Sequence, residues 1–185
     1  MNNAIPNPIA TTVSGVHVAA IVHSDHGLAD SVLADFALAL QRSGRRVRGL
    51  VQRFRGGGSG KENAILLDVG EGRTYPLFQN LGSGSVSCSV DENSIASASA
   101  VLRRALSENP DLVIVNRFGA LEAAGGGFAT EMLALMSEGI PLLTVVAESC
   151  LADWRNFTGN CSVFLTSTPE ALENWFAGMT DMAKK

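Results

Sequence analysis

Residues Val16 to Gly44 read VHVAAIVHSDHGLADSVLADFALALQRSG. Their first part, Val16–Val22, is a nearly continuous apolar run rich in β-branched residues, which is typical of a central parallel strand covered on both faces. Apolar residues then recur at helical spacing from Asp30 to Gln41, and Gly44 supplies a stop just beyond the last turn. This stretch therefore predicts a strand, a loop and a helix, which is the first unit of an α/β sheet.

The rest of the chain continues this alternation. Two segments on either side of Gly70–Gly72 predict an antiparallel hairpin at one edge of the sheet, because glycines take the positive φ of a tight reversal. The Gly-rich segment Arg53–Asn63 is expected to be a flexible loop. Further strands are expected at Arg46–Gln52, Leu112–Val115, Pro141–Ala147 and Ser162–Thr166. Further helices are expected from a cap at Asp91 to about Glu108, at Ala124–Glu138, at Ala152–Phe157, and from Pro169 to about Met182.

Short apolar strands that alternate with amphipathic helices imply right-handed crossovers. We therefore predict a three-layer α/β fold with a mostly parallel sheet and an antiparallel hairpin at one edge. Residues 1–12 contain no Lys or Arg and no continuous apolar segment, so they are expected to form a flexible N-terminal arm rather than a secretion signal. Residues 13–185 are expected to form a single domain.

Composition narrows the classes of function. The chain is 46% hydrophobic and 17% charged with a formal net charge of −4, which excludes a disordered acidic tail and a generally basic nucleic-acid binder. No apolar run approaches the roughly 20 residues that cross a bilayer. The 3 cysteines are widely spaced without a C-x-x-C pair, so we expect reduced thiols and a cytoplasmic location.

In parallel sheets, ligands bind beyond the carboxyl ends of the strands, where helix N-termini present unpaired N–H groups. The loop after the first predicted strand has the position of a phosphate loop, but HSDHGLADS lacks the G-x-x-x-x-G-K-[ST] pattern and its lysine, which argues against ordinary nucleotide hydrolysis. The two histidines in this loop, His23 and His26, are expected to be solvated rather than to bind a metal, because no third ligand accompanies them. The candidate ligand-binding residues here are Ser24, Asp25, His26 and Gly27.

Two other glycine-rich segments are candidates for the same role. Gly56–Lys61 reads GGGSGK, but it leads into a hairpin strand instead of a helix, so we reject it as a phosphate loop. Gly82–Cys88 offers hydroxyls, free amides and a thiol, as oxyanion-binding nests do, although such segments are more often plain loops. Cys88 has no basic neighbour that would make it a nucleophile. The candidate ligand-binding residues of this segment are Ser83, Ser85 and Cys88.

The polar pair Asn116-Arg117 follows the predicted strand Leu112–Val115, where P-loop enzymes place the acid that holds Mg²⁺. Arg117 offers a bidentate donor suited to phosphate or another tetrahedral oxyanion. Two interpretations stay open at this point. The pair binds a ligand together with Glu122, or Asn116 bonds to neighbouring loops while Arg117 pairs with Glu122.

Several segments together resemble an uncharacterised bacterial family, a domain of unknown function often encoded beside molybdenum ABC transporters. They are RVRGLVQ, DVGEGRTYPL, LGSGSVSC, NPDLVIVNRFGALEAAGGG, GIPLLTVV and the Trp154-Arg155-Asn156-Phe157 turn. More distantly, the layout is similar to P-loop nucleoside-triphosphatases of the cancer-related and thermophilic type and to the P-loop protein of molybdopterin guanine dinucleotide synthesis. This second resemblance implies a P-loop nucleoside-triphosphatase-like fold.

Those relatives carry a full phosphate loop and an acidic D-E-x-G-x-x-E element. Asn116 stands where that element has the metal-associated Asp and Arg117 where it has the next Glu, whereas Gly119 and Glu122 match. Because both acids are replaced, the resemblance does not carry ATPase activity over to this chain.

We therefore expect a non-catalytic, P-loop-like binding protein of molybdenum metabolism, with molybdate or tungstate preferred as ligand and a phosphate-bearing molecule as the other choice. One alternative is a nucleoside-triphosphatase with a non-standard phosphate loop that uses ATP or GTP with Mg²⁺. Another is an adaptor for a molybdenum transporter or a cofactor-assembly protein. Trp175 and Phe176 are compatible with a core position or with a homodimer surface. No residue is assigned a catalytic or metal-ligating role.

Overall fold

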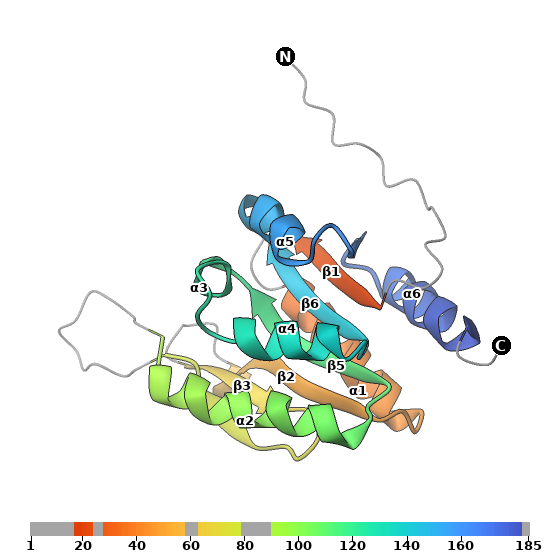
Figure 1. Cartoon of the computed structure of the whole chain (residues 1–185). Coiled ribbons are helices and arrows are strands. Elements are labelled where there is room, and N and C mark those ends of the chain that lie inside the picture. Colours follow the sequence, from red (N-terminus) through yellow and green to blue (C-terminus); the bar gives the residue numbers. More distant parts are fainter. Residues whose placement is uncertain (1–16, 24–27, 58–62, 79–89, 183–185) are drawn as a thin grey trace.

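The computed structural model describes residues 17–23, 28–57, 63–78 and 90–182. Within these ranges, seven strands form one sheet in the order β4-β3-β2-β5-β6-β1-β7 (Figure 1). The strands are β1 (Val18–His23), β2 (Val47–Phe54), β3 (Ala64–Asp68), β4 (Thr74–Pro76), β5 (Leu112–Phe118), β6 (Leu142–Ala147) and β7 (Val163–Leu165). The helices are α1 (Leu28–Arg42), α2 (Glu92–Glu108), α3 (Ala120–Ala123), α4 (Ala129–Ser137), α5 (Leu151–Phe157) and α6 (Pro169–Met182), with short 3-10 turns at Arg55–Gly57 and Glu148–Cys150.

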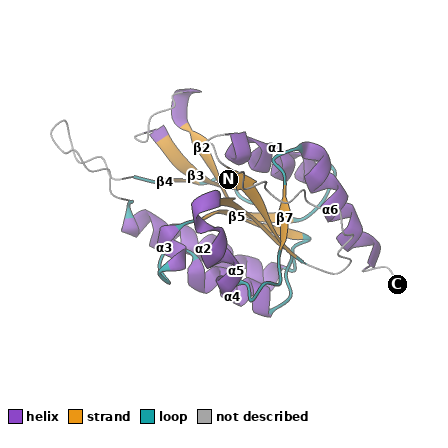
Figure 2. Cartoon of the chain, turned by 90° about the horizontal axis from the view of Figure 1, so that it is seen from above, coloured by secondary structure: helices purple, strands orange, loops and turns teal. Residues whose placement is uncertain are grey.

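Strands β2, β5, β6, β1 and β7 are parallel to one another. Strands β3 and β4 add antiparallel pairing at the β2 side of the sheet. Helices α1 and α6 cover one face of the sheet, and α2, α4 and α5 cover the other (Figure 2). This is the predicted three-layer α/β fold with a hairpin at one edge. The predicted arm, residues 1–12, lies outside the described residues. No helix in the described part of the chain is both long enough and apolar enough to cross a membrane.

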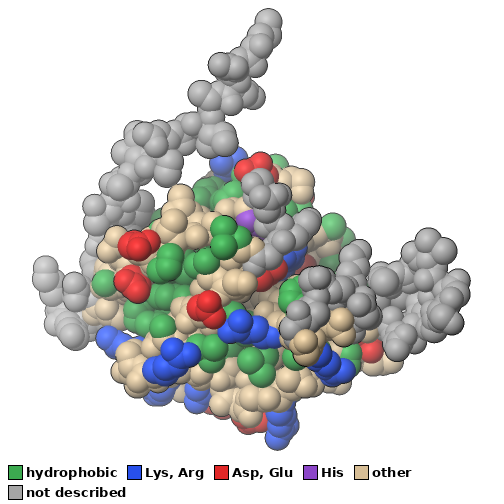
Figure 3. Space-filling model, turned by 180° about the vertical axis from the view of Figure 1, so that it is seen from behind, with side chains coloured by type: hydrophobic (Ala, Val, Ile, Leu, Met, Phe, Trp, Pro, Cys, Tyr) green, Lys and Arg blue, Asp and Glu red, His purple; other side chains and the backbone are tan. Residues whose placement is uncertain are grey.

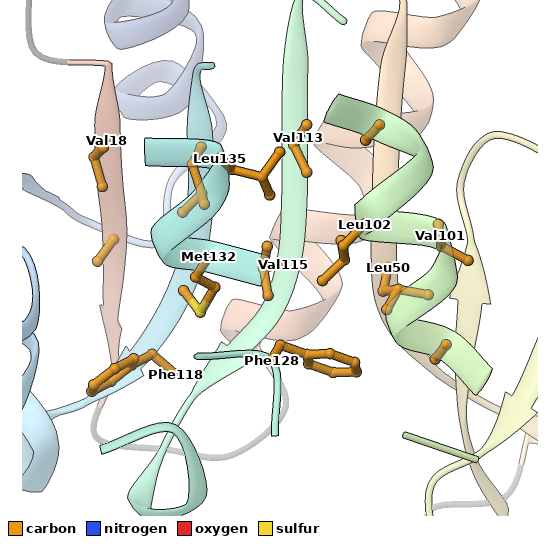
Figure 4. Close-up of a cluster of buried hydrophobic side chains, with 14 of the residues drawn as sticks. Val18, Leu50, Val101, Leu102, Val113, Val115, Phe118, Phe128, Met132 and Leu135 are labelled. Atoms are coloured by element: carbon orange, nitrogen blue, oxygen red, sulfur yellow. The ribbon is translucent and has the colours of Figure 1, made fainter. Parts of the chain in front are cut away.

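The core consists of two apolar layers separated by the sheet, and β5 contributes to both. Leu112 and Ile114 pack toward α1 and α6, whereas Val113 and Val115 pack toward α2 and α4 (Figure 4). All four side chains are completely buried. Burial on both faces explains why the central strands are nearly continuous apolar runs in the sequence.

Several predicted boundaries differ from the structure. The helix expected at Ala124–Glu138 is α4 (Ala129–Ser137), which begins five residues later than expected because Gly125 and Gly127 have positive φ values of 84° and 55° and form a turn before it. The short helix α3 (Ala120–Ala123) before this turn is not predicted from the sequence. Strand β5 continues three residues beyond Val115, to Phe118. The expected loop from Arg53 begins later, since Arg53 and Phe54 belong to β2 and a 3-10 turn follows them.

The predicted cap at Asp91 is confirmed. Asp91 Oδ1 accepts hydrogen bonds from the backbone N–H groups of Asn93 and Ser94, both at 3.1 Å. These bonds satisfy two donors that the first turn of α2 would otherwise leave without partners. The helix ends at Glu108 as predicted, and Asn109 follows in the left-handed conformation with φ 47°.

Candidate functional site

The carboxyl ends of the parallel strands β1, β2, β5 and β6 lie at the same end of the sheet, and α1 begins there. Among the described residues, Asp30, Gln52, Asn116 and Arg117 meet at this end, and we call these four residues the carboxyl corner. The expectation that His23 is a solvated loop residue is wrong, because His23 is the last residue of β1 and is buried where this strand ends. On the face of the molecule that Figure 3 shows, acidic and basic side chains are interspersed with apolar ones.

A β-bulge near the end of β5 shapes the corner. Val115 is paired with Thr144 of β6, and Phe118 is paired with Val146, so three steps along β5 match two steps along β6. Such an extra residue bends the strand and changes the direction of the side chains at that point. The two residues between Val115 and Phe118 are Asn116 and Arg117, the pair that the sequence analysis singled out.

Asn116 is 5% exposed and connects β5 to β2. The backbone pairing of these strands runs only from Val47 to Gly49 on β2. Beyond that point, Asn116 Oδ1 accepts a hydrogen bond from the Gln52 backbone N–H at 2.7 Å, and Asn116 Nδ2 donates to Gln52 Oε1 at 3.5 Å. The side-chain amide therefore replaces the missing backbone contact, which agrees with the structural alternative for Asn116, except that the partner is a neighbouring strand and not a loop.

Arg117 reaches from β5 to the first turn of α1. Its Nη2 donates a hydrogen bond to Asp30 Oδ2 at 2.6 Å, which makes a charge-assisted ion pair between residues 87 positions apart. The Arg117 side chain is 26% exposed and that of Asp30 is 6% exposed. The alternative in which Arg117 pairs with Glu122 is wrong. The bulge directs Arg117 to α1, whereas the Glu122 carboxylate accepts hydrogen bonds from backbone N–H groups of its own loop.

Asp30 is a residue of the corner that the sequence analysis treated only as the start of a helix. The acid is favourable there, because the N-terminus of a helix carries a partial positive charge. Its second oxygen, Oδ1, is buried and has no hydrogen-bond partner in the described ranges of the chain. The signal in the sequence was an acid in the first turn of the helix after the phosphate-loop position, but its partner is too distant in sequence to be recognised.

Glu122 closes the loop between β5 and α4. It is 7% exposed, and its carboxylate accepts hydrogen bonds from the backbone N–H groups of Gly119 at 3.1 Å and Phe128 at 3.2 Å. Burial raises the pKa of Glu122, and these backbone donors offset part of that rise. A Cβ at Gly127 would lie 2.0 Å from Glu122 Oε1, so the loop needs glycine there. Glu122 thus has a structural role, and its binding of a ligand stays a prediction.

The other candidate site residues lie outside the described residues, and their roles stay predictions. They are Ser24, Asp25, His26, Gly27, Ser83, Ser85 and Cys88. Arg53, near the end of β2, forms an ion pair at 3.2 Å with Asp35 of α1, and the Asp35 side chain is 73% exposed. Arg53 therefore has a partner on the protein surface.

The order of strands and the two helical layers give a three-layer α/β fold like that of P-loop nucleoside-triphosphatases, with which the chain shares its fold. The chain belongs to the family described as protein of unknown function (DUF2478), whose model matches residues 18–175.

Similarity to characterised proteins is distant or partial. A molybdenum import ATP-binding protein, ModC 2 of Bradyrhizobium diazoefficiens, is 36% identical over 169 residues, which are 91% of this chain but 19% of that protein. The solution structure of a human cancer-related nucleoside triphosphatase superposes with a TM-score of 0.61 at 18% identity, covering 91% of this chain and 95% of the other. THEP1 of the hyperthermophile Aquifex aeolicus superposes with a TM-score of 0.62 at 15% identity, covering 91% and 100%.

Proposed function

We propose that this chain is a binding protein that holds a phosphate-bearing molecule or another tetrahedral oxyanion at the carboxyl corner, without hydrolysing a nucleotide. The observation that carries the proposal is the environment of Asn116. P-loop enzymes hold Mg²⁺ with an acid at the end of this strand. Here an amide occupies the position, and both of its polar atoms bond to Gln52. The corner is therefore built from a contact between strands instead of a metal ligand.

Binding of an anion is supported by two features of the same corner. Helix α1 begins at the carboxyl end of strand β1, where its dipole favours negative charge. Arg117 lies next to the first turn of α1 with 26% of its side chain exposed, so this residue is not fully enclosed by the protein. Asp30 neutralises this charge in part, which favours ligands that make hydrogen bonds over ligands attracted by charge alone.

A role in molybdenum metabolism is supported by the similarity to the molybdenum import ATP-binding protein of Bradyrhizobium diazoefficiens. Molybdate and tungstate therefore belong in the ligand series beside phosphate and nucleotides. A calorimetric titration of the chain tests the proposal. The ligands are inorganic phosphate, molybdate, tungstate, ATP and GTP, and each nucleotide is used with and without Mg²⁺. We expect at least one of them to bind, and we expect no phosphate release from ATP or GTP.

Substitution of Arg117 tests whether the ligand binds at the carboxyl corner. We expect Arg117→Ala to weaken binding about tenfold or more, which is the scale of one charge-assisted hydrogen bond. Arg73→Ala is the matched control, because Arg73 carries the same charge on the β3–β4 hairpin and its side chain is 69% exposed. Phosphate release with Mg²⁺ that is lost in Arg117→Ala would instead establish the nucleoside-triphosphatase alternative.

A second candidate function, an adaptor for a molybdenum transporter, is favoured by one specific observation. The chain spans 19% of the length of the relative it matches, and that relative is named as an ATP-binding protein of molybdenum import. Because the matched region is part of a longer molybdenum import protein in that relative, proteins of this kind are candidate partners of this chain. Analytical ultracentrifugation of the chain mixed with a purified molybdenum import ATP-binding protein tests this. Two independent sedimenting species would argue against an adaptor.

A further inference from the structure

The Asp30 carboxylate has one satisfied and one unsatisfied oxygen. Oδ2 accepts a hydrogen bond from Arg117 at 2.6 Å, whereas Oδ1 is buried without a hydrogen-bond partner in the described part of the molecule. Asp30 as a whole is 5% exposed. A carboxylate oxygen that has lost its water and gained no donor costs free energy, so a native structure rarely leaves one in this state without a reason. The missing partner has to be a hydrogen-bond donor, because the ionised carboxylate can only accept.

The ion pair also restricts which anions can use the corner. One guanidinium beside one carboxylate leaves the pair without net charge. A fully deprotonated oxyanion that approaches Arg117 brings acceptor oxygens toward Asp30 Oδ1, which repels them. An oxyanion that keeps a proton on one oxygen avoids this conflict, because its hydroxyl can donate to Oδ1 while its other oxygens accept from Arg117.

We infer that Asp30 determines the ligand class of the corner, and that this class is a monoprotonated phosphate group in preference to sulfate, molybdate or tungstate. Phosphate monoesters lose their second proton near pH ~6, so a substantial fraction of them still carries a proton close to neutral pH. Sulfate, molybdate and tungstate carry none under these conditions. The inference rests on the proposed function, since it specifies the ligand of the same site, and it selects phosphate between the two ligand classes expected there.

The test is a calorimetric series on the full chain at about pH 6.5, where inorganic phosphate is largely monoanionic or in exchange with that form. The ligands are inorganic phosphate, sulfate and molybdate. We expect phosphate to bind about tenfold more tightly than either of the others, which corresponds to one well-formed hydrogen bond. This comparison uses the natural chain, so it does not depend on whether a variant folds.

Asp30→Asn provides the complementary measurement. The amide keeps the shape of the side chain but can donate through Nδ2, so it should accept a deprotonated oxyanion as a partner. We expect sulfate and molybdate to gain about tenfold in affinity and the preference for phosphate to disappear. Asp35→Asn is the matched control on the same helix, since its side chain is 73% exposed and the change in charge is identical. Circular dichroism establishes that each variant is folded.

The outcomes separate the inference from the proposed function. Equal binding of phosphate and sulfate by the natural chain, or binding of molybdate or a nucleotide but not of phosphate, overturns the role of Asp30 and leaves an anion-binding protein. A gain in Asp35→Asn that equals the gain in Asp30→Asn also overturns that role, because a general change in charge then explains both. The absence of binding of every anion and nucleotide, in the natural chain and in Asp30→Asn, overturns both proposals.

Discussion

Val115 and Phe118 of β5 pack in the same apolar layer, on the face of the sheet that α2, α4 and α5 cover, although residues three positions apart in a regular strand point to opposite faces. The bulge between them absorbs the difference, as their pairing with Thr144 and Val146 shows. It places Asn116 and Arg117 in a bent part of the strand, where one contacts β2 and the other contacts α1. The carboxyl corner is therefore a consequence of one extra residue in β5.

Removal of the Arg117 guanidinium should destabilise the fold. We expect Arg117→Ala to lower the free energy of unfolding by about 2 kcal/mol, because Asp30 would remain a buried carboxylate without its cation. Urea denaturation measures this loss. Arg53→Ala is the control, since its partner Asp35 is largely exposed, and it should change the free energy of unfolding by about 0.5 kcal/mol or less. Similar losses in the two variants would contradict a special role for the buried pair.

Restoration of an acid at the end of β5 should not restore an enzyme. In Asn116→Asp, two acceptor oxygens would face each other where Asn116 Nδ2 now donates to Gln52 Oε1. We expect a loss of about 1 kcal/mol in the free energy of unfolding, and no release of phosphate from Mg²⁺-bound ATP or GTP. Asn156→Asp, on the exposed surface of α5, should leave stability nearly unchanged. Nucleotide turnover in Asn116→Asp would show that the corner still holds the remaining catalytic groups.

Glu122 should make stability depend on pH. Burial raises its pKa above the ordinary value of 4.5, despite backbone donors that lower it. Between the ordinary and the raised value, the folded protein binds more protons at this site than the unfolded chain does, so the contribution to the free energy of unfolding falls as pH rises through that interval.

The matched variant for this effect is Glu122→Gln, which cannot titrate. We expect the natural chain to lose stability relative to Glu122→Gln as pH rises from about 4 toward neutral, as measured by urea denaturation at each pH. The absolute stability of Glu122→Gln does not matter for this test. The measured quantity is how the difference in the free energy of unfolding between the natural chain and the variant changes with pH. A difference that is constant across the pH range would contradict the raised pKa.

Gly49 should tolerate no side chain. It has φ +111°, and a Cβ at this position would lie 1.9 Å from the backbone oxygen of Ile114 on the neighbouring strand. We expect Gly49→Ala to cost about 3 kcal/mol or more in the free energy of unfolding, since the β2–β5 pairing must separate to make room. Gly44→Ala, at φ +83° with open space around it, should cost about 1 kcal/mol. Equal losses in the free energy of unfolding for the two variants would show that the positive φ determines the cost and the close approach to Ile114 does not.

The elements that could be predicted share a local signal. The hairpin around Gly70–Gly72, the cap at Asp91 and the apolar strands follow from turn residues, capping residues and continuous burial on both faces of a sheet. The helix expected at Ala124–Glu138 begins only at Ala129. The positive φ of Gly125 and Gly127, together with the Glu122 contact to Phe128, forms a turn between α3 and α4 that the helical pattern does not reveal.

The sequence by itself determined the α/β architecture, the edge hairpin and the position of Asn116 and Arg117 after an apolar strand, because each of these follows from neighbouring residues or from short-range periodicity. Only the tertiary structure decided what these two side chains do. The bulge in β5 depends on the register with β6, and the partners of Asn116 and Arg117 lie 64 and 87 residues away along the chain. Register and distant contacts arise when the whole sheet packs, so no local pattern could have paired Arg117 with Asp30.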